Sequence, residues 1–119
     1  MKNILLADDE PVFLSCLEDL LSSLDSAFKV YTAENGEQAL HILKSLPIDL
    51  LITDLQMPGM DGQELLLHAA EDFSGLPVII VSAHTDFGEA KRPGVKSSFC
   101  FDKPVNVHEL VAAVCSLLH

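Results

Sequence analysis

Three short apolar runs constrain the fold of this chain more than any other feature. They cover residues 4–7, 50–53 and 78–81, and none alternates regularly between apolar and polar side chains. Each run has the length of a strand and falls far short of the roughly 20 apolar residues that a membrane helix needs. Continuous apolar strands are typical of parallel sheets that helices cover on both faces.

Segments with helical periodicity separate these runs. The expected helices cover about residues 11–24, 36–46, 61–69, 86–91 and 106–118, and weaker strands are expected at 28–32 and 99–101. The first helix is expected to bury a stripe formed by Val12, Phe13, Cys16, Leu17, Leu20, Leu21 and Leu24. Five strand–helix units in this order predict an α/β domain with a doubly wound, five-stranded parallel sheet.

The length and net charge of the chain limit the number of domains and the kinds of partner that are expected. A chain of 119 residues predicts one domain, and a formal charge of −11 argues against nucleic-acid contact by it. The start of the chain lacks the shape of a signal peptide, so no membrane association is expected. The three cysteines, Cys16, Cys100 and Cys115, form no C-x-x-C motif. They favour a reducing cytoplasm, with Cys16 and Cys115 packed in the core.

Polar residues follow the predicted strands at the edge where such sheets place their functional sites. Asp8 and Asp9 follow the first strand, Asp54 the third, Ser82 ends the fourth, and Lys103 follows the fifth. Clustered carboxylates repel each other unless a cation lies among them, and an incomplete cage of oxygen ligands favours Mg²⁺ over Ca²⁺. A carboxylate is also able to act as a nucleophile toward a phosphoryl group.

Each of these residues also has a simpler interpretation. Asp8 and Asp9 are suited to capping the helix that Pro11 begins, and Asp54 to a turn after a strand. Ser82 and Lys103 are ordinary residues when taken singly. Their joint placement after four strands favours the metal and phosphate interpretation.

The chain resembles the receiver domain of bacterial two-component response regulators over its whole length. The resemblance rests on I-L-L-A-D-D-E, L-L-I-T-D-L-Q-M-P-G-M-D-G, V-I-I-V-S-A and D-K-P, in this order. It implies a flavodoxin-like fold with strand order 2-1-3-4-5. It also implies that residues 1–119 form one receiver domain, either free-standing or excised from a longer chain.

The resemblance implies a role for each site residue. Asp54 would accept a phosphoryl group from a phosphohistidine on a histidine kinase or a histidine phosphotransfer domain. Asp9 would bind Mg²⁺ directly, Asp8 would help through water, and the backbone carbonyl of Gln56 would be a further ligand. Lys103 would pair with the phosphoryl oxygens.

Further positions follow from the same resemblance. The peptide bond before Pro104 would be cis, and Ser82 would turn toward the phosphate. Met57 would help to hold the loop after Asp54. Gln56 and His84 would rim the phosphoryl pocket and tune hydrolysis.

The chain departs from the family pattern around its fifth strand. Cys100 stands where the family usually has a switch aromatic, and alternation turns its neighbours Phe99 and Phe101 to the opposite face. Lys96-Ser97 replaces the usual Gly-Ala pair, and residues 92–94 (Arg-Pro-Gly) predict a short or broken helix before this strand.

The expected function is a phosphorylation-controlled switch that acts on an attached output domain or a downstream protein. Such a domain promotes only its own phosphorylation and dephosphorylation and is not an enzyme for an outside substrate. The alternative is a pseudo-receiver, an interaction module that signals without phosphate. An aspartyl phosphatase is a poorer fit because Asp54 is followed by Leu55-Gln56 rather than by a D-x-D pattern. A flavodoxin is also poorer, since the acids after the first strand would repel a flavin phosphate.

Overall fold

The computed structural model describes residues 2–55, 57, 59–60, 62–82 and 99–118. Its strands are β1 (Lys2–Ala7), β2 (Phe28–Ala33), β3 (Leu50–Thr53), β4 (Val78–Ser82) and β5 (Phe99–Asp102). All neighbouring pairs are parallel, and the strand order is β2-β1-β3-β4-β5. The predicted doubly wound sheet and its order are therefore confirmed.

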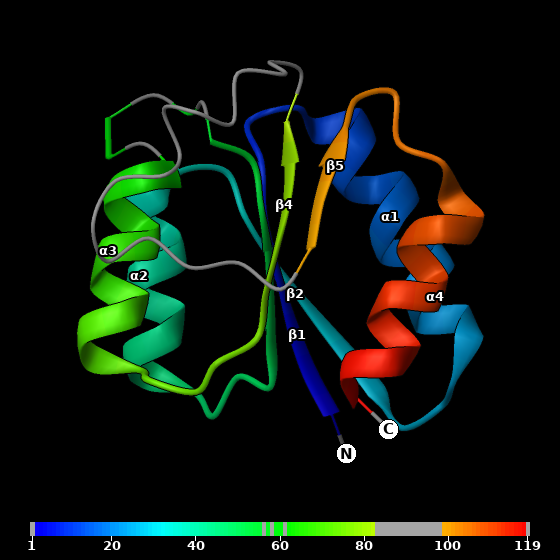
Figure 1. The fold of residues 1–119 in the computed structure, drawn as a ribbon, viewed down its shortest axis with the longest axis horizontal. Coiled ribbons are helices and arrows are strands. Elements are labelled where there is room, and N and C mark those ends of the chain that lie inside the picture. The colour runs from blue at the N-terminus through cyan, green and yellow to red at the C-terminus, as the bar shows by residue number, and fades with distance from the viewer. Residues whose placement is uncertain (1, 56, 58, 61, 83–98, 119) are drawn as a thin grey trace.

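Helices cover both faces of this sheet. They are α1 (Pro11–Leu24), α2 (Gly36–Ser45), α3 (Gly62–Asp72) and α4 (Val107–Leu118). Figure 1 shows α1 and α4 on one face and α2 and α3 on the other. The helix expected over 86–91 and the break expected at 92–94 lie outside the described residues. None of the described helices is both long and apolar enough to cross a membrane.

Alternate side chains of each central strand enter two separate cores. Ile4 and Leu6 of β1 pack in the core beneath α1 and α4, whereas Leu5 and Ala7 pack in the core beneath α2 and α3. Every residue of β3 and β4 is buried. The two-sided burial explains why these strands are apolar without alternation.

The helix starts use the signals that the sequence contains. Pro11 occupies the first turn of α1. The Asn35 side chain accepts a 2.8 Å hydrogen bond from the backbone N–H of Gln38, and Asn106 accepts one of 3.2 Å from that of Glu109. These caps satisfy N–H groups that have no partner within the helix.

The predicted stripe of α1 is wrong at three positions. Val12 is 77% exposed, Leu24 is 40% exposed, and Cys16 is also exposed, so Cys16 does not pack in the core. The buried residues are Leu14, Leu17 and Leu21. At 3.6 residues per turn, Val12 and Cys16 point well away from the direction that these leucines share, whereas Leu24 is the last residue of the helix.

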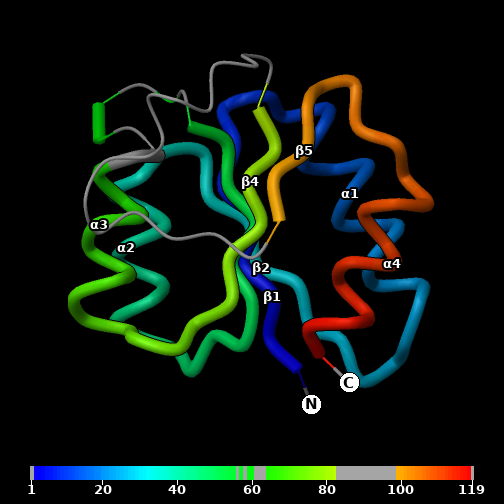
Figure 2. The backbone as a smooth tube through the Cα atoms, viewed as in Figure 1, coloured from blue at the N-terminus to red at the C-terminus, as the bar shows by residue number. Residues whose placement is uncertain are grey.

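The carboxyl ends of the strands meet at one edge of the sheet. Figure 2 shows that β1 begins and α4 ends at the opposite edge, so that the carboxyl ends of β1, β3, β4 and β5 share the upper edge. The residues that follow these strands are therefore close in space although they are distant in the sequence.

Two substitutions in α1 test which side of the helix supports the fold. Leu21→Ala removes a fully buried side chain and is expected to lower the free energy of unfolding by about 3 kcal/mol. Val12→Ala, on the exposed side, should change it by less than about 0.5 kcal/mol. Urea denaturation measures both values, and equal losses would contradict the orientation of α1.

Candidate functional site

The sheet's hydrogen-bond ladder fixes the backbone of the site. The N–H of Asp8 donates to the Ala33 carbonyl at 3.0 Å, and the N–H of Asp54 donates to the Ala7 carbonyl at 2.9 Å. On the other side of the sheet, the N–H of Lys103 donates to the Ser82 carbonyl at 2.9 Å. Each bond extends the pairing of two strands by one residue. The backbone of each site residue is therefore held in place by the sheet.

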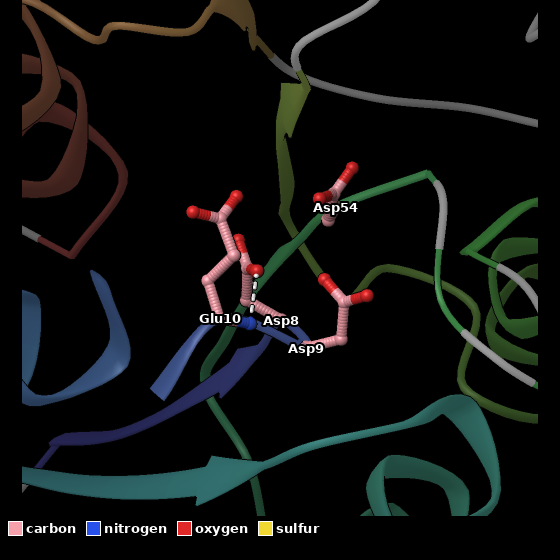
Figure 3. A group of neighbouring side chains, drawn as sticks. All are labelled: Asp8, Asp9, Glu10 and Asp54. Atoms are coloured by element: carbon pink, nitrogen blue, oxygen red, sulfur yellow. Dashed lines mark hydrogen bonds between the residues drawn. The ribbon is translucent and has the colours of Figure 1, made fainter. Parts of the chain in front are cut away.

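Among the described residues, four carboxylates gather at this edge. Asp8, Asp9 and Glu10 follow β1, Asp54 follows β3, and one oxygen from each lies within 4.8 Å of all the others (Figure 3). Asp8 and Asp54 are buried, whereas Asp9 and Glu10 are exposed. The cluster therefore has a buried floor and a rim that solvent reaches.

Lys103 binds three of these carboxylates. Its Nζ donates to Asp8 Oδ2 at 2.7 Å, to Glu10 Oε1 at 2.9 Å and to Asp54 Oδ2 at 3.2 Å. The lysine side chain is only 12% exposed. A single ammonium group, delivered by the segment after β5, thus joins the segments that follow β1 and β3.

The aromatic ring of Phe13 lies against the same ammonium group. Lys103 Nζ is 4.6 Å from the centroid of the Phe13 ring, within the range of a cation–π interaction. The ring covers part of the lysine that the carboxylates leave free, and it adds a favourable contact that holds Nζ beside the acids.

The pKa values of Asp8 and Lys103 reflect the balance of burial and charge. Burial raises the pKa of Asp8 above its ordinary value, and the repulsion of Asp54 adds to this, although the hydrogen bond from Lys103 works against it. Burial alone would lower the pKa of Lys103, but the carboxylates of Asp8, Glu10 and Asp54 together raise it above its ordinary value of 10.5. The two pKa values differ in origin because Lys103 has several anions beside it, whereas Asp8 has one cation and further anions beside it.

A raised pKa means that the folded protein disfavours the ionised form of Asp8. Ionised Asp8 therefore costs folding free energy at neutral pH, and Lys103 offsets part of that cost.

The structure does not support the interpretation of Asp8 and Asp9 as helix caps. Glu10 is the N-cap of α1, with no side-chain capping bond. Asp8 Oδ1 instead accepts the N–H of Glu10 at 2.9 Å, a bond that orients the carboxylate just ahead of the helix (Figure 3). Asp8 thus presents one oxygen to the backbone and the other to Lys103.

The described residues fit a hard divalent cation. Mg²⁺ holds its ligands at about 2.1 Å, so two oxygens on one ion lie roughly 3 to 4 Å apart. One oxygen of each carboxylate lies within 4.8 Å of the others, so the cluster is already close to that spacing. Four carboxylates and one ammonium also leave a formal charge of −3, which a divalent cation would reduce.

Other predicted positions have mixed outcomes. Ser82 is fully buried at the end of β4, and Met57 is buried. The peptide bond between Lys103 and Pro104 is cis, as the resemblance implies. Gln56 and His84 lie outside the described residues.

The fifth strand has the predicted alternation. The rings of Phe99 and Phe101 stack with centroids 6.2 Å apart, which places both on one face, and Phe101 packs against the core beneath α1 and α4. Cys100 therefore lies on the other face, where it is exposed.

Sequence reasoning missed two participants in the site. Glu10 belongs to the D-D-E motif, but only its length and its position beside α1 bring its carboxylate to Lys103. For Phe13 the sequence showed only an apolar residue at helical spacing. That pattern predicted a place in the buried stripe of the first helix and not a contact with a cation.

The sheet order and the polar residues after its strands define a flavodoxin-like α/β domain with an acidic cluster and its lysine at the carboxyl edge of the sheet. The family model for the response regulator receiver domain matches residues 4–115. The chain belongs to this family and is a receiver domain of two-component response regulators. Receiver domains are signalling modules.

Individual relatives agree with this assignment. The transcriptional regulatory protein GlrR of Escherichia coli is 36% identical over 94% of this chain, which spans 25% of that protein. The response regulator GtcR of Aneurinibacillus migulanus is 35% identical over 95% of this chain, which spans 46% of that protein. The chain thus spans between a quarter and a half of the length of these relatives.

Solved structures have the same fold. The response regulator protein TrrA of Thermotoga maritima, in complex with Mg²⁺ and BeF, has a TM-score of 0.88 and 31% identity, covering 99% of this chain and 100% of that one. The signal receiver domain of an HD domain-containing protein of Pseudomonas fluorescens has a TM-score of 0.91 and 28% identity, covering 98% and 94%.

Replacing the lysine tests the electrostatic balance of the cluster. Lys103→Met leaves the carboxylates facing each other, so unfolding in EDTA at pH 7 is expected to require about 2 kcal/mol less free energy. Because the pKa of Lys103 is raised, the lysine's contribution to stability is complete below pH 10.5 and is lost as the pH rises through its folded-state pKa. Saturating Mg²⁺ should restore part of the loss.

Lys44→Met, on the exposed side of α2, is the matched control and should change stability by less than about 0.5 kcal/mol. Equal stability of Lys103→Met and the wild type in EDTA would contradict the proposed balance.

Proposed function

We propose that Asp54 accepts a phosphoryl group in the presence of Mg²⁺, and that the resulting change in the domain controls an output. The observation that carries the proposal is the meeting of Asp54 with Asp8 and Lys103 in one cluster, with Lys103 Nζ 3.2 Å from Asp54 Oδ2. An ammonium group in that position is suited to bind the oxygens of a phosphoryl group on Asp54.

The transfer balances with this chain's own groups. An oxygen of Asp54 forms a bond to phosphorus while the bond from phosphorus to the donor's histidine nitrogen breaks, and that nitrogen keeps the electron pair. Lys103 donates hydrogen bonds to the phosphoryl oxygens. Bound Mg²⁺, held by Asp8, Asp9 and Asp54 with the carbonyl of Gln56, would supply further positive charge.

Ser82 is proposed to sense the phosphoryl group. It is fully buried at the end of β4, and its backbone carbonyl accepts the N–H of Lys103 at 2.9 Å. Because the Ser82 backbone is bonded to that of Lys103, its hydroxyl is well placed to turn toward a group that Lys103 binds. His84 is proposed to rim the same pocket.

A largely apolar groove beside the cluster supports a protein phosphodonor as the partner. Its lining includes Phe13, Cys16 and Leu20 of α1, Pro104 and Val107 after β5, and Glu10 and Lys103 of the cluster. A histidine kinase or phosphotransfer domain has to bring its phosphohistidine to Asp54. A surface that runs from exposed apolar side chains to Lys103 is suited to guide it there.

The chain spans only part of the length of the relatives named above, so the rest of the proposal concerns what this domain acts on. We propose that residues 1–119 form one receiver domain that acts on an attached output domain or a separate protein. It takes part only in its own phosphorylation and dephosphorylation and has no other substrate. Its three free cysteines favour work in the cytoplasm.

Intact-mass measurement tests the proposal. The wild-type domain, incubated with Mg²⁺ and phosphoramidate, is expected to gain one phosphoryl group, because Lys103 and Mg²⁺ then flank the Asp54 side chain. Asp54→Asn should gain none, since an amide oxygen is a far weaker nucleophile. EDTA should suppress the adduct on the wild type.

Asp72→Asn, an exposed aspartate at the end of α3, serves as the control and should behave as the wild type. A wild type without an adduct would overturn the proposal and favour the pseudo-receiver. An equal adduct on Asp54→Asn would move the phosphoacceptor elsewhere.

A further inference from the structure

The segment that follows the proposed phosphoacceptor lies against the first turn of α2. The backbone N–H of Met60 donates a 3.0 Å hydrogen bond to Glu37 Oε1, and 23 residues separate the two in the sequence. This bond ties the loop between β3 and α3 to a helix that begins after a different strand.

Two glycines make this close approach possible. A Cβ atom on Gly36 would collide with the Met60 carbonyl oxygen and would lie 2.9 Å from its Cγ. Gly59 has a φ of 74°, in the left-handed region, and a Cβ there would lie 2.6 Å from Glu37 Oε1. Both sides of the contact therefore lack side chains where the backbones meet.

The same loop is also held at its other end. Leu55 and Met57 are 7% exposed and pack in the core beneath α2 and α3. The segment thus leaves Asp54 through a buried anchor and reaches its second attachment at Glu37.

We propose that Glu37 is a positioning residue for phosphoryl transfer, which it assists by fixing the loop that follows Asp54. The inference rests on the proposed function of Asp54. Phosphoryl transfer needs the acceptor oxygen, the cation ligands and the lysine in one arrangement, and a displacement of about 1 Å is enough to cost up to 100-fold in rate. Glu37 touches none of the reacting atoms and acts through the Met60 backbone.

The exposure of Glu37 makes its role measurable. Because its side chain is at the surface, its loss should leave the fold intact, whereas the loop loses its attachment. Rate and stability are therefore expected to respond differently, which separates positioning from a structural role.

Two substitutions at one position provide the test. Glu37→Gln keeps an oxygen that accepts the Met60 N–H, and Glu37→Leu removes it. With phosphoramidate and saturating Mg²⁺, Glu37→Leu is expected to gain phosphate about tenfold more slowly than the wild type, and Glu37→Gln within about twofold of it. The midpoint of urea unfolding should be nearly the same for both variants.

Further variants keep the result interpretable. Glu109→Leu replaces the first-turn glutamate of α4, on the other face of the sheet, and should not change the rate. Gly59→Ala approaches the contact from the loop side and should slow the reaction as Glu37→Leu does.

The outcomes separate the two proposals. A wild-type adduct with an unchanged rate in Glu37→Leu would overturn the role of Glu37 alone. Equal slowing by Gln and Leu would also overturn it, because the acceptor oxygen would not be what matters. A wild type that gains no phosphate would overturn the function of Asp54 and, with it, the role of Glu37.

Discussion

The contact of one ammonium group with three carboxylates is the interaction on which this site depends. Lys103 reaches Asp8, Glu10 and Asp54, which lie 95, 93 and 49 residues away in the sequence. Two unit charges of the same sign about 4 Å apart repel by roughly 4 kcal/mol near a protein surface. The sheet is able to bring these carboxylates together only because a cation accompanies them, and that need for positive charge prepares the site for a metal and a phosphoryl group.

The fold meets this need with backbone geometry rather than with flexible side chains. The parallel ladder ends β1, β3 and β5 at one edge, and one further backbone hydrogen bond holds each of Asp8, Asp54 and Lys103. Rigid placement on strands is what phosphoryl transfer demands of its acceptor and its lysine. The loop after Asp54 lies beyond this ladder, and its contact with α2 takes over the same task.

The sequence predicted those parts of the site that follow from strand ends. Asp8, Asp54, Ser82 and Lys103 each stand directly after or at the end of an apolar strand, and in a parallel sheet such positions converge. Glu10 was missed because its contact depends on the path of a side chain at the start of a helix. The sequence pattern also did not predict which side of α1 faces the core. The helix has so many apolar residues that more than one of its sides could have been the buried one.

The contact between Glu37 and Met60 could not be predicted for a related reason. No periodicity relates the first turn of one helix to the loop before another, and glutamate at that position is an ordinary helix former. Gly36 and Gly59 indicate close backbone approach, but not which residues approach each other.

A titration with Mg²⁺ followed by amide NMR shows whether the carboxylates form one cation site, because it needs no phosphate donor. We expect saturable shifts of the Asp9, Asp54 and Leu55 amides, and almost none at Asp49 and Gly75 near the opposite edge of the sheet. Asp9→Asn should weaken the binding severalfold. Shifts that do not saturate, or that spread evenly over the acidic surface, would contradict the claim that these carboxylates form one cation site.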